Sequence, residues 1–468
     1  MTFHRFFLYS FSSVILFISS ELYSYFLLTS GKELSSLITI SFILVLFFVF
    51  IINFNVILKS GSELSHYKFI PLLFVIMLQL GILAGFYFSD MGVSALWVID
   101  SYQMHIPGST NIANYLMGSE NLREQDSVFD KIYFTHLIVG IFFVLFGINA
   151  ISSGLALMMA KVATTVIMFH LGKRMFDEKI ASIAILIYSL SPISLFYTIT
   201  FYKEAIVQLL IIIIYLCIFT FVSGHDSSQK YSNYIIFLLS LLLIMNERFY
   251  LFPIFMFTGI LLIMLKHSIK AGIKCLILLL GIAGGYIFYN VYSTALDFSN
   301  LLEVLKGFRS AYHNYSDVDP INIDIPYSLA FLKFIFTPFF TLNKFDIFDG
   351  YSYLLIWGSF LGQIIMVFSL FGMYKNLKLN FSKTWFMLTP FFIFLLIFSY
   401  ISPFNGRIRD SFLPLIAIYS AYGIKAFSSK LSMGKNLKVY NSIYGGTPDE
   451  YPPAFHARSR GIEHDGVN

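Results

Sequence analysis

The chain alternates long apolar runs with short polar segments over almost its whole length. A helix needs about 20 apolar residues to cross the hydrocarbon core of a bilayer. Runs of this kind predict twelve spans, at residues 6–29, 36–57, 69–88, 152–172, 180–200, 204–223, 231–246, 249–266, 274–292, 351–373, 385–401 and 411–427. The predicted fold class is therefore an all-α polytopic membrane protein.

Composition supports this fold class and excludes others. Of 468 residues, 57% are hydrophobic and 12% are charged, whereas a soluble domain carries about 25% charged residues. So little charge cannot cover the surface of a water-soluble globule. The two cysteines, Cys217 and Cys275, lie in apolar runs without metal-ligand neighbours, which excludes a disulfide scaffold and gives no zinc signal. No basic stripe suited to nucleic acid occurs.

Lysine and arginine positions predict the orientation of the spans. With the N-terminus in the cytoplasm, the inner segments are strongly basic, and the outer segments hold more acidic than basic residues, as the positive-inside rule requires. The pattern holds only if two further apolar segments, 133–148 and 327–343, do not cross. We expect both to lie at the outer interface. The chain is thus expected in a bacterial inner (plasma) membrane, with both termini cytoplasmic.

The predicted layout is one transmembrane domain, residues 1–440, followed by a tail. The main polar segments of this domain are the outer loops 89–131 and 293–349 and a short outer loop, 402–410. The tail, 441–468, has no apolar run and contains Gly-Gly and Pro-Pro. Such a segment cannot bury enough apolar surface to fold, so we expect a disordered cytoplasmic tail.

The first outer loop contains a carboxylate among polar and aromatic neighbours. Asp100 is followed by Tyr102, Gln103 and His105, and Pro107 suits the first turn of a helix. Ile112, Ala113, Leu116 and Met117 then fall on one helical face, with Ser109, Thr110 and Asn114 largely opposite. This spacing predicts a helix on the membrane surface, which would hold Asp100 at the depth of a lipid head group.

Further charged residues stand at the outer ends of predicted spans. They are Lys203 and Glu204 at the start of one span, Glu247 and Arg248 in a very short turn, and Arg407 and Arg409 in loop 402–410. Guanidinium groups suit bidentate contacts to phosphate, although outer arginines also anchor spans among head groups. A carboxylate that opens a helix is also favoured by the helix dipole alone.

One cation lies within a predicted span. Lys161 falls inside residues 152–172, where a charge is costly and indicates function. The alternative is that its long side chain reaches toward the outer surface and keeps the ammonium in water.

Carboxylates and cations on one face suit glycosyl transfer from a lipid-phosphate sugar. A carboxylate takes the proton of an acceptor hydroxyl, and cations stabilise the departing phosphate. We predict Asp100 as the base and Glu204 as a second carboxylate of the same site. The predicted substrate-binding residues are Tyr102, Gln103, His105, His136, Lys161, Lys203, Glu247, Arg248, Arg407 and Arg409.

The sequence resembles the GT-C glycosyltransferases, which include protein O-mannosyltransferases, the lipid A aminoarabinose transferase and oligosaccharyltransferase catalytic subunits. The similarity lies mainly between Ile99 and Val222. The family places an acid in its first large outer loop, followed by Tyr and an Ala-containing helix. Asp100, Tyr102 and Ala113 match that pattern.

Later segments extend the resemblance. "FTHLIVGIFFVLFG" (134–147) matches a juxtamembrane segment, and matches to the family's spans are Lys161 with "LGKRMF", Pro192 with Glu204, and Arg407 and Arg409 before Pro414. Two spans precede the family's expected first span. The second acid follows a lysine and is not part of an Asp-x-Asp pair, so a requirement for a divalent metal stays open.

The resemblance implies a glycosyltransferase that takes sugar from a polyprenyl-phosphate donor to a lipid, glycan or protein acceptor at the outer face, in contact with membrane lipids. A single base implies inversion at the anomeric carbon. Two alternatives remain. A polysaccharide polymerase or ligase of the O-antigen type would use the same donors. A transporter or flippase would place ionisable groups and broken helices near the bilayer midplane.

Overall fold

The structure, a computed structural model, describes residues 3–29, 32–59, 70–88, 105–119, 133–223, 230–266, 332, 335, 352–401 and 409–444. Within these residues it contains 14 α-helices and no strands. The helices are α1 (Phe3–Thr29), α2 (Lys32–Lys59), α3 (Ile70–Phe88), α4 (Ile106–Leu116), α5 (Phe134–Phe146), α6 (Ala150–Met175), α7 (Glu178–Leu190), α8 (Pro192–Ile199), α9 (Glu204–Ser223), α10 (Lys230–Glu247), α11 (Leu251–Lys266), α15 (Ser352–Leu379), α16 (Phe381–Ile401) and α18 (Leu413–Tyr444).

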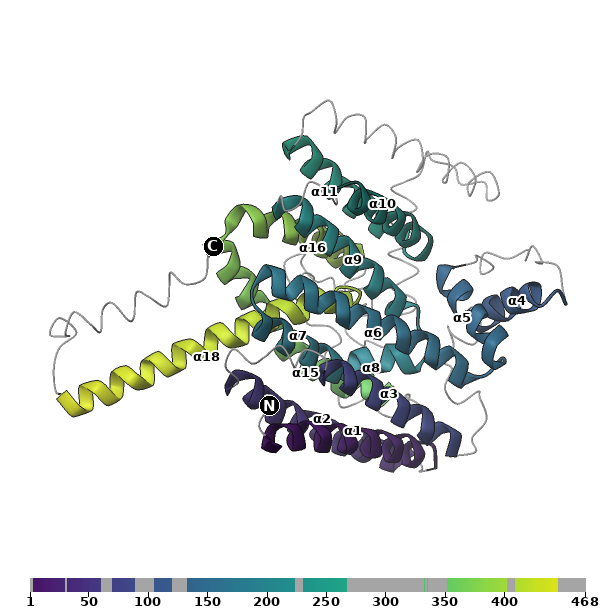
Figure 1. The fold of residues 1–468 in the computed structure, drawn as a ribbon, viewed down its shortest axis with the longest axis horizontal. Coiled ribbons are helices and arrows are strands. Elements are labelled where there is room, and N and C mark those ends of the chain that lie inside the picture. The colour runs from purple at the N-terminus through teal and green to yellow at the C-terminus, as the bar shows by residue number, and fades with distance from the viewer. Residues whose placement is uncertain are drawn as a thin grey trace.

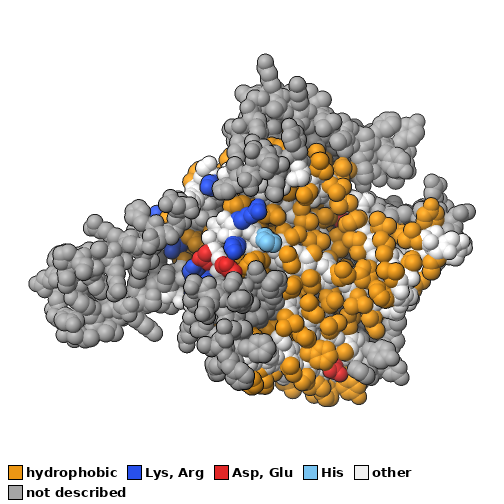
Figure 2. All heavy atoms as spheres, in the orientation of Figure 1, with side chains coloured by type: hydrophobic (Ala, Val, Ile, Leu, Met, Phe, Trp, Pro, Cys, Tyr) orange, Lys and Arg blue, Asp and Glu red, His pale blue; other side chains and the backbone are white. Residues whose placement is uncertain are grey.

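Several of these helices are suited to cross a bilayer. In the described part of the chain, 6 helices are long and apolar enough, or 7 if the bent pair α7–α8 counts as one span. Large side chains such as Leu44 and Ile235 are exposed, and Figure 2 shows apolar side chains covering much of one face. A surface of this kind needs lipid around it. The expected class, an integral α-helical membrane protein, is confirmed at this level; the expected span 274–292 lies outside the described residues.

The helices form a bundle with a central group and two flanks (Figure 1). α1, α2 and α3 pack together on one side, and α10 and α11 lie on the other. Between them α6 packs against α7 and α9, while α18 packs against α7 and α15. The short helices α4 and α5 pack on each other at one end, where α5 also contacts α6 and α10.

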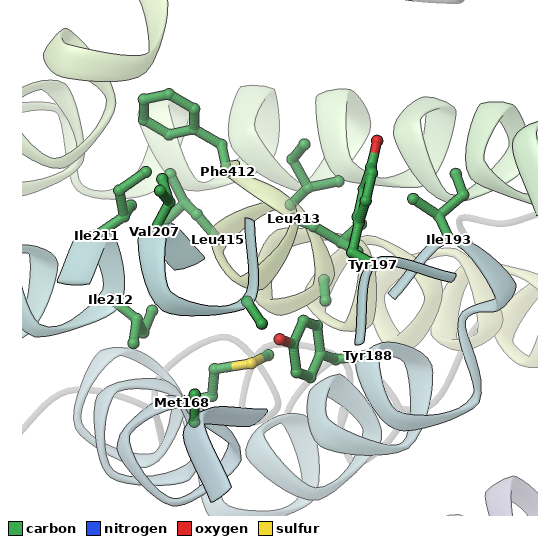
Figure 3. Close-up of a cluster of buried hydrophobic side chains, with 14 of the residues drawn as sticks. Met168, Tyr188, Ile193, Tyr197, Val207, Ile211, Ile212, Phe412, Leu413 and Leu415 are labelled. Carbon is green, nitrogen blue, oxygen red and sulfur yellow. The ribbon is translucent and has the colours of Figure 1, made fainter. Parts of the chain in front are cut away.

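The centre of the bundle is an apolar cluster from five helices (Figure 3). Met168 of α6, Tyr188 of α7 and Tyr197 of α8 are buried there, beside Ile211 of α9 and Leu415 of α18. Dense packing of this kind fixes neighbouring backbones closely. The ends of these helices are therefore held in defined relative positions.

The expected span 180–200 is not one helix. α7 ends at Leu190, α8 begins at Pro192, and the two are bent by 54°. Proline lacks an N–H and its ring clashes with the preceding turn, and it pushes the residue before it toward extended geometry. Ser191 is accordingly extended, with φ −66° and ψ 120°, and its side chain caps α8 by accepting from the Ser194 N–H.

α18 and α15 pack closely on each other. A Cβ added at Gly372 would clash with the Tyr419 carbonyl oxygen, and one at Gly423 would clash with that of Phe368. Small residues allow backbones to approach closely in membrane bundles. α18 also continues to Tyr444, so the helix extends past the predicted domain boundary at 440, and the rest of the predicted tail lies outside the described residues.

Candidate functional site

Polar side chains from several chain segments meet at one end of the bundle. α9 begins at Glu204 and packs against α10, which ends at Glu247. α5 begins at this end, α8 finishes there, and the turn before α18 completes it. We call this group the polar end cluster; its members are His105, His136, Lys203, Glu204, Glu247, Arg248, Arg409 and Asp410.

The start of α9 and the end of α10 are joined by an ion pair. Nη2 of Arg248 donates to Oε1 of Glu204. The Glu204 side chain is completely buried, whereas that of Arg248 is 12% exposed. Removing one partner of a buried pair leaves an uncompensated charge, which is strongly destabilising. Glu204 therefore holds a guanidinium at the rim of the cluster, and Arg248 is the most exposed of its described cations.

Glu247 links the end of α10 to the start of α5. Its Oε1 accepts from the Thr135 backbone N–H at 2.6 Å and from the Thr135 hydroxyl at 2.9 Å. The adjacent Asn246 side chain accepts from the Phe134 N–H at 2.7 Å. Carboxylates are favoured at helix N-termini, where N–H groups lack helical partners. Burial raises the pKa of the Glu247 carboxyl, opposed by the charges of Lys203 and Arg248.

Lys203 is fixed from two sides. Its Nζ donates to the Glu247 carbonyl oxygen at 3.0 Å and lies 3.8 Å from the centroid of the Tyr133 ring. A ring face within about 6 Å stabilises an ammonium. The side chain is nearly buried, so this cation lies within the cluster.

Two buried histidines are hydrogen-bonded to each other. His105 Nδ1 and His136 Nε2 are 3.0 Å apart, and the Tyr133 N–H donates to His136 Nδ1 at 3.3 Å. Because His136 Nδ1 accepts, a neutral ring carries its proton on Nε2 and donates it to His105. Burial, helped by the charge of Lys203, lowers the pKa of His136 to about 3. His136 is therefore neutral at ordinary pH.

Asp410 is held by three side chains. Its Oδ1 accepts from Nε and Nη2 of Arg409 at 3.1 and 2.8 Å, and its Oδ2 accepts from the Tyr197 hydroxyl at 2.9 Å. In Figure 3 that hydroxyl points away from the other labelled side chains. Gln208 donates to the Asp410 carbonyl oxygen at 2.9 Å. Burial raises the pKa of Asp410, and the charge of Glu204 acts in the same direction, against Arg409 and Tyr197.

The turn between α8 and α9 contains an unusual backbone conformation. Phe201 has a φ of 55°, which costs a non-glycine residue about 1–3 kcal/mol. Its ring lies 5.9 Å from that of His105, and the side chain is buried. The same turn places Lys203 close enough to His136 for its charge to act on the imidazole.

The predicted surface helix exists as α4, but its buried face differs from the prediction. Ser109 is fully buried together with Ile112 and Ala113, whereas Leu116 and Met117 are about half exposed. The reason is the close packing of α4 on α5. A Cβ at Gly140 would stand 3.0 Å from the Ser109 carbonyl oxygen, so α5 covers Ser109 of the expected polar face together with Ile112 and Ala113 of the expected apolar face.

Lys161 does not reach toward the surface, which corrects the snorkelling alternative. Its side chain is completely buried, Nζ lies 5.7 Å from the Tyr188 ring centroid, and Nζ has no hydrogen-bond partner within the described residues. The Tyr188 hydroxyl donates to Gln208 at 2.6 Å, and Gln208 donates to the Asp410 backbone. Tyr188, whose ring lies beside Lys161, is thus connected to Asp410 of the polar end cluster through Gln208.

The structure brings together seven of the predicted site residues. These are His105, His136, Lys203, Glu204, Glu247, Arg248 and Arg409. Asp100, Tyr102, Gln103 and Arg407 lie outside the described residues. Sequence reasoning missed Tyr133, Tyr197, Gln208 and Asp410 as members or supports of the cluster. Only Asp410 left a signal, since it directly follows Arg409 at the start of the last helical region.

Within the described residues, no group of three or more His, Cys, Asp and Glu side chains could hold a metal ion. Comparison with known proteins gives no match of the chain to any family model, curated protein or solved structure.

Proposed function

We propose that the chain is a membrane glycosyltransferase that transfers sugar from a polyprenyl-phosphate donor at the polar end cluster. The observation that carries this proposal is the ion pair of Glu204 with Arg248, which holds an arginine side chain that is 12% exposed at the end of an apolar bundle. Lys203 and Arg409 lie in the same cluster. Positioned cations at a membrane boundary suit a phosphate that remains attached to its lipid.

The proposed reaction is a direct displacement. The acceptor hydroxyl loses its proton to a carboxylate, its oxygen bonds to the anomeric carbon, and the bond to the phosphate oxygen breaks. Polyprenyl phosphate leaves with that electron pair. Asp100 is proposed as the base, because it lies five residues before His105 in the sequence and Glu204 is already engaged.

Glu204 has a different role in this proposal. Its carboxylate is buried and paired with Arg248, so we assign it to orient the guanidinium. Glu247 plays a similar part for Lys203 and the start of α5. Arg407, two residues before Arg409 in the sequence, and the neighbours of Asp100, Tyr102 and Gln103, are proposed to complete the donor and acceptor contacts.

The proposal extends to the whole chain. It includes twelve spans in a GT-C-like arrangement, a bacterial inner membrane, an outward-facing polar end cluster and inversion at the anomeric carbon. The acceptor is a lipid, glycan or protein. The α6–α7 turn lies at the other end of the bundle and contains Lys173, Arg174 and Lys179. Basic residues at that end agree with a cytoplasmic location for it.

One assay tests the activity. Purified protein in liposomes is given a panel of polyprenyl-phosphate sugars, and released polyprenyl phosphate is measured with an acceptor extract. Release with at least one donor supports the proposal, provided that Arg248→Gln lowers it and Lys378→Gln does not. Absence of release across the panel, or equal loss in both variants, contradicts it.

A transporter is the second candidate, because two observations favour it. The α7–α8 pair is bent by 54° at Ser191, and Lys161 is a buried cation within a span. Broken helices and ionisable groups near the midplane are typical of transporters. In the same liposomes, donor that crosses the bilayer without release of polyprenyl phosphate would favour transport over transfer.

A further inference from the structure

A second polar feature lies at the opposite end of the bundle. α7 and α8 lead from Glu178 toward the polar end cluster, so the turn between α6 and α7 lies at the other end. Beside this turn a groove of about 320 Å³ opens between α3, α6 and α7. The groove has no part in the proposed sugar transfer.

The groove changes character along its length. Leu72 of α3, Val166 and Phe169 of α6 and Ile185 of α7 form its apolar part. His170, Lys173 and Arg174 follow on α6 toward the end of the helix. From Val166 to Arg174 the helix rises about 12 Å at 1.5 Å per residue. An apolar wall therefore leads to a basic mouth.

The nearby acids leave this mouth basic. Lys173 is 54% exposed and lies 3.2 Å from Glu178. Asp177 is engaged elsewhere, since it pairs with Lys425 and accepts from the Ile180 N–H at 2.8 Å. Arg174 is exposed and forms no ion pair in the part of the chain that the structure describes. The mouth thus holds one nearby carboxylate, Glu178, and two basic side chains, Lys173 and Arg174.

We infer that this groove binds an anionic phospholipid from the leaflet at its own end of the bundle. The phosphate contacts Arg174 and Lys173, with His170 beside it, and an acyl chain follows Val166 and Phe169 toward the bundle interior. The basic mouth of the groove complements the phosphate of such a lipid, and the apolar wall complements its acyl chain. In Figure 2 basic side chains and a histidine stand where the broad apolar surface ends. A free phosphate would match only the mouth.

The test measures lipid binding to the purified full-length chain by native mass spectrometry. Phosphatidylglycerol is titrated against the unchanged protein, the pair Lys173→Gln with Arg174→Gln, and a control pair, Lys378→Gln with Lys383→Gln. The control removes equal charge from the α15–α16 turn. We expect about tenfold weaker binding in the groove variant, since a charged phosphate contact contributes about 1.5–3 kcal/mol, and less than twofold change in the control.

Two further arms separate the lipid from other anions. Phosphatidylcholine should bind at least fivefold more weakly than phosphatidylglycerol. Val166→Trp, which fills the apolar part, should weaken phosphatidylglycerol binding and leave the mouth intact. Equal losses in the groove and control variants overturn the inference. So does displacement of the lipid by inorganic phosphate together with no effect of Val166→Trp, because the site would then be an anion site only.

Discussion

Arg248 and Glu204 stand 44 residues apart in the sequence and form an ion pair that joins the end of α10 to the start of α9. The Glu204 carboxylate is inaccessible to solvent, and the Arg248 side chain is 12% exposed. A buried carboxylate in an ion pair is well placed to orient its arginine and badly placed to take a proton from an acceptor hydroxyl. In our account the pair is one functional unit, with Arg248 toward the donor phosphate and Glu204 behind it.

The first prediction concerns this unit. Arg248→Gln should raise the apparent KM for the donor about tenfold or more, because a charged phosphate contact contributes about 1.5–3 kcal/mol. Glu204→Gln should have a similar effect by releasing Arg248. The double variant should raise the apparent KM no more than the more severe single variant does. The reason is that substitutions of residues that act as a unit do not have additive effects. Donor kinetics on all three variants give the measurement.

Two controls separate a loss of donor binding from unfolding of the variants. Arg248→Lys keeps the charge but not the planar fork, so it should recover part of the lost donor affinity. Thermal unfolding of each variant is followed in parallel. Additive effects of the two substitutions on KM would mean that Glu204 acts separately from Arg248.

The second prediction concerns pH and His136. The folded pKa is about 3 and the ordinary value is 6.5, so between these values the unfolded chain takes up a proton that the folded chain excludes. The stability that neutral His136 contributes is full above pH 6.5. It is lost as pH falls toward 3, at up to about 1.4 kcal/mol per pH unit. The unfolding midpoint should therefore drop on acidification, and His136→Gln should flatten that drop.

Equal acid-side slopes of the unfolding midpoint in the His136 variant and the unchanged protein would show that other groups govern acid stability.

The third prediction tests the support of Asp410. Tyr197→Phe removes the hydroxyl that donates to Oδ2 of the buried carboxylate. Leaving a buried acceptor without its donor costs about 1–3 kcal/mol, so the thermal midpoint should fall by several degrees. Tyr422→Phe is the matched control, because the Tyr422 ring stacks on Phe176 with centroids 4.4 Å apart and is only half-buried. Equal midpoints for both variants would remove the Tyr197 contact from the account.

The fourth prediction fixes orientation. In a cysteine-free background, Ser119→Cys at the end of α4 should react with an impermeant thiol reagent added from outside. Ser382→Cys in the α15–α16 turn should react only after the membrane is opened. Both serines are exposed, whereas Ser109 is buried by α5 and would be protected on either side. The reverse labelling pattern would invert the proposed topology.

Sequence alone predicted those features that depend on local chemistry. An apolar run beginning at Glu204 predicted α9 within a residue of its observed ends, because the length of a span is set by the bilayer. Pro192 was a visible helix breaker, yet the run around it was assigned to one span. The hydropathy of a segment depends on its apolar residues and does not take into account that proline lacks a backbone N–H and ends a helix.

The remaining features depend on contacts between distant segments. Ser109 is buried because Gly140, on another helix, lets α4 approach closely. The partner of Glu204 directly follows α10, and the Tyr197 and Gln208 partners of Asp410 lie on α8 and α9. Periodicity assigns a face to each helix but not the neighbour that covers it. For this reason the sequence predicted charges on one face without predicting how they pair.

We propose above that the polar end cluster binds the phosphate of a lipid-linked donor. The most direct measurement is single-turnover release of polyprenyl phosphate from a radiolabelled donor, by the unchanged protein, Arg248→Gln and Lys378→Gln in liposomes. We expect release by the unchanged protein and by Lys378→Gln, and at least tenfold slower release by Arg248→Gln at subsaturating donor. Equal release rates in all three proteins, with Arg248→Gln folded, would contradict it.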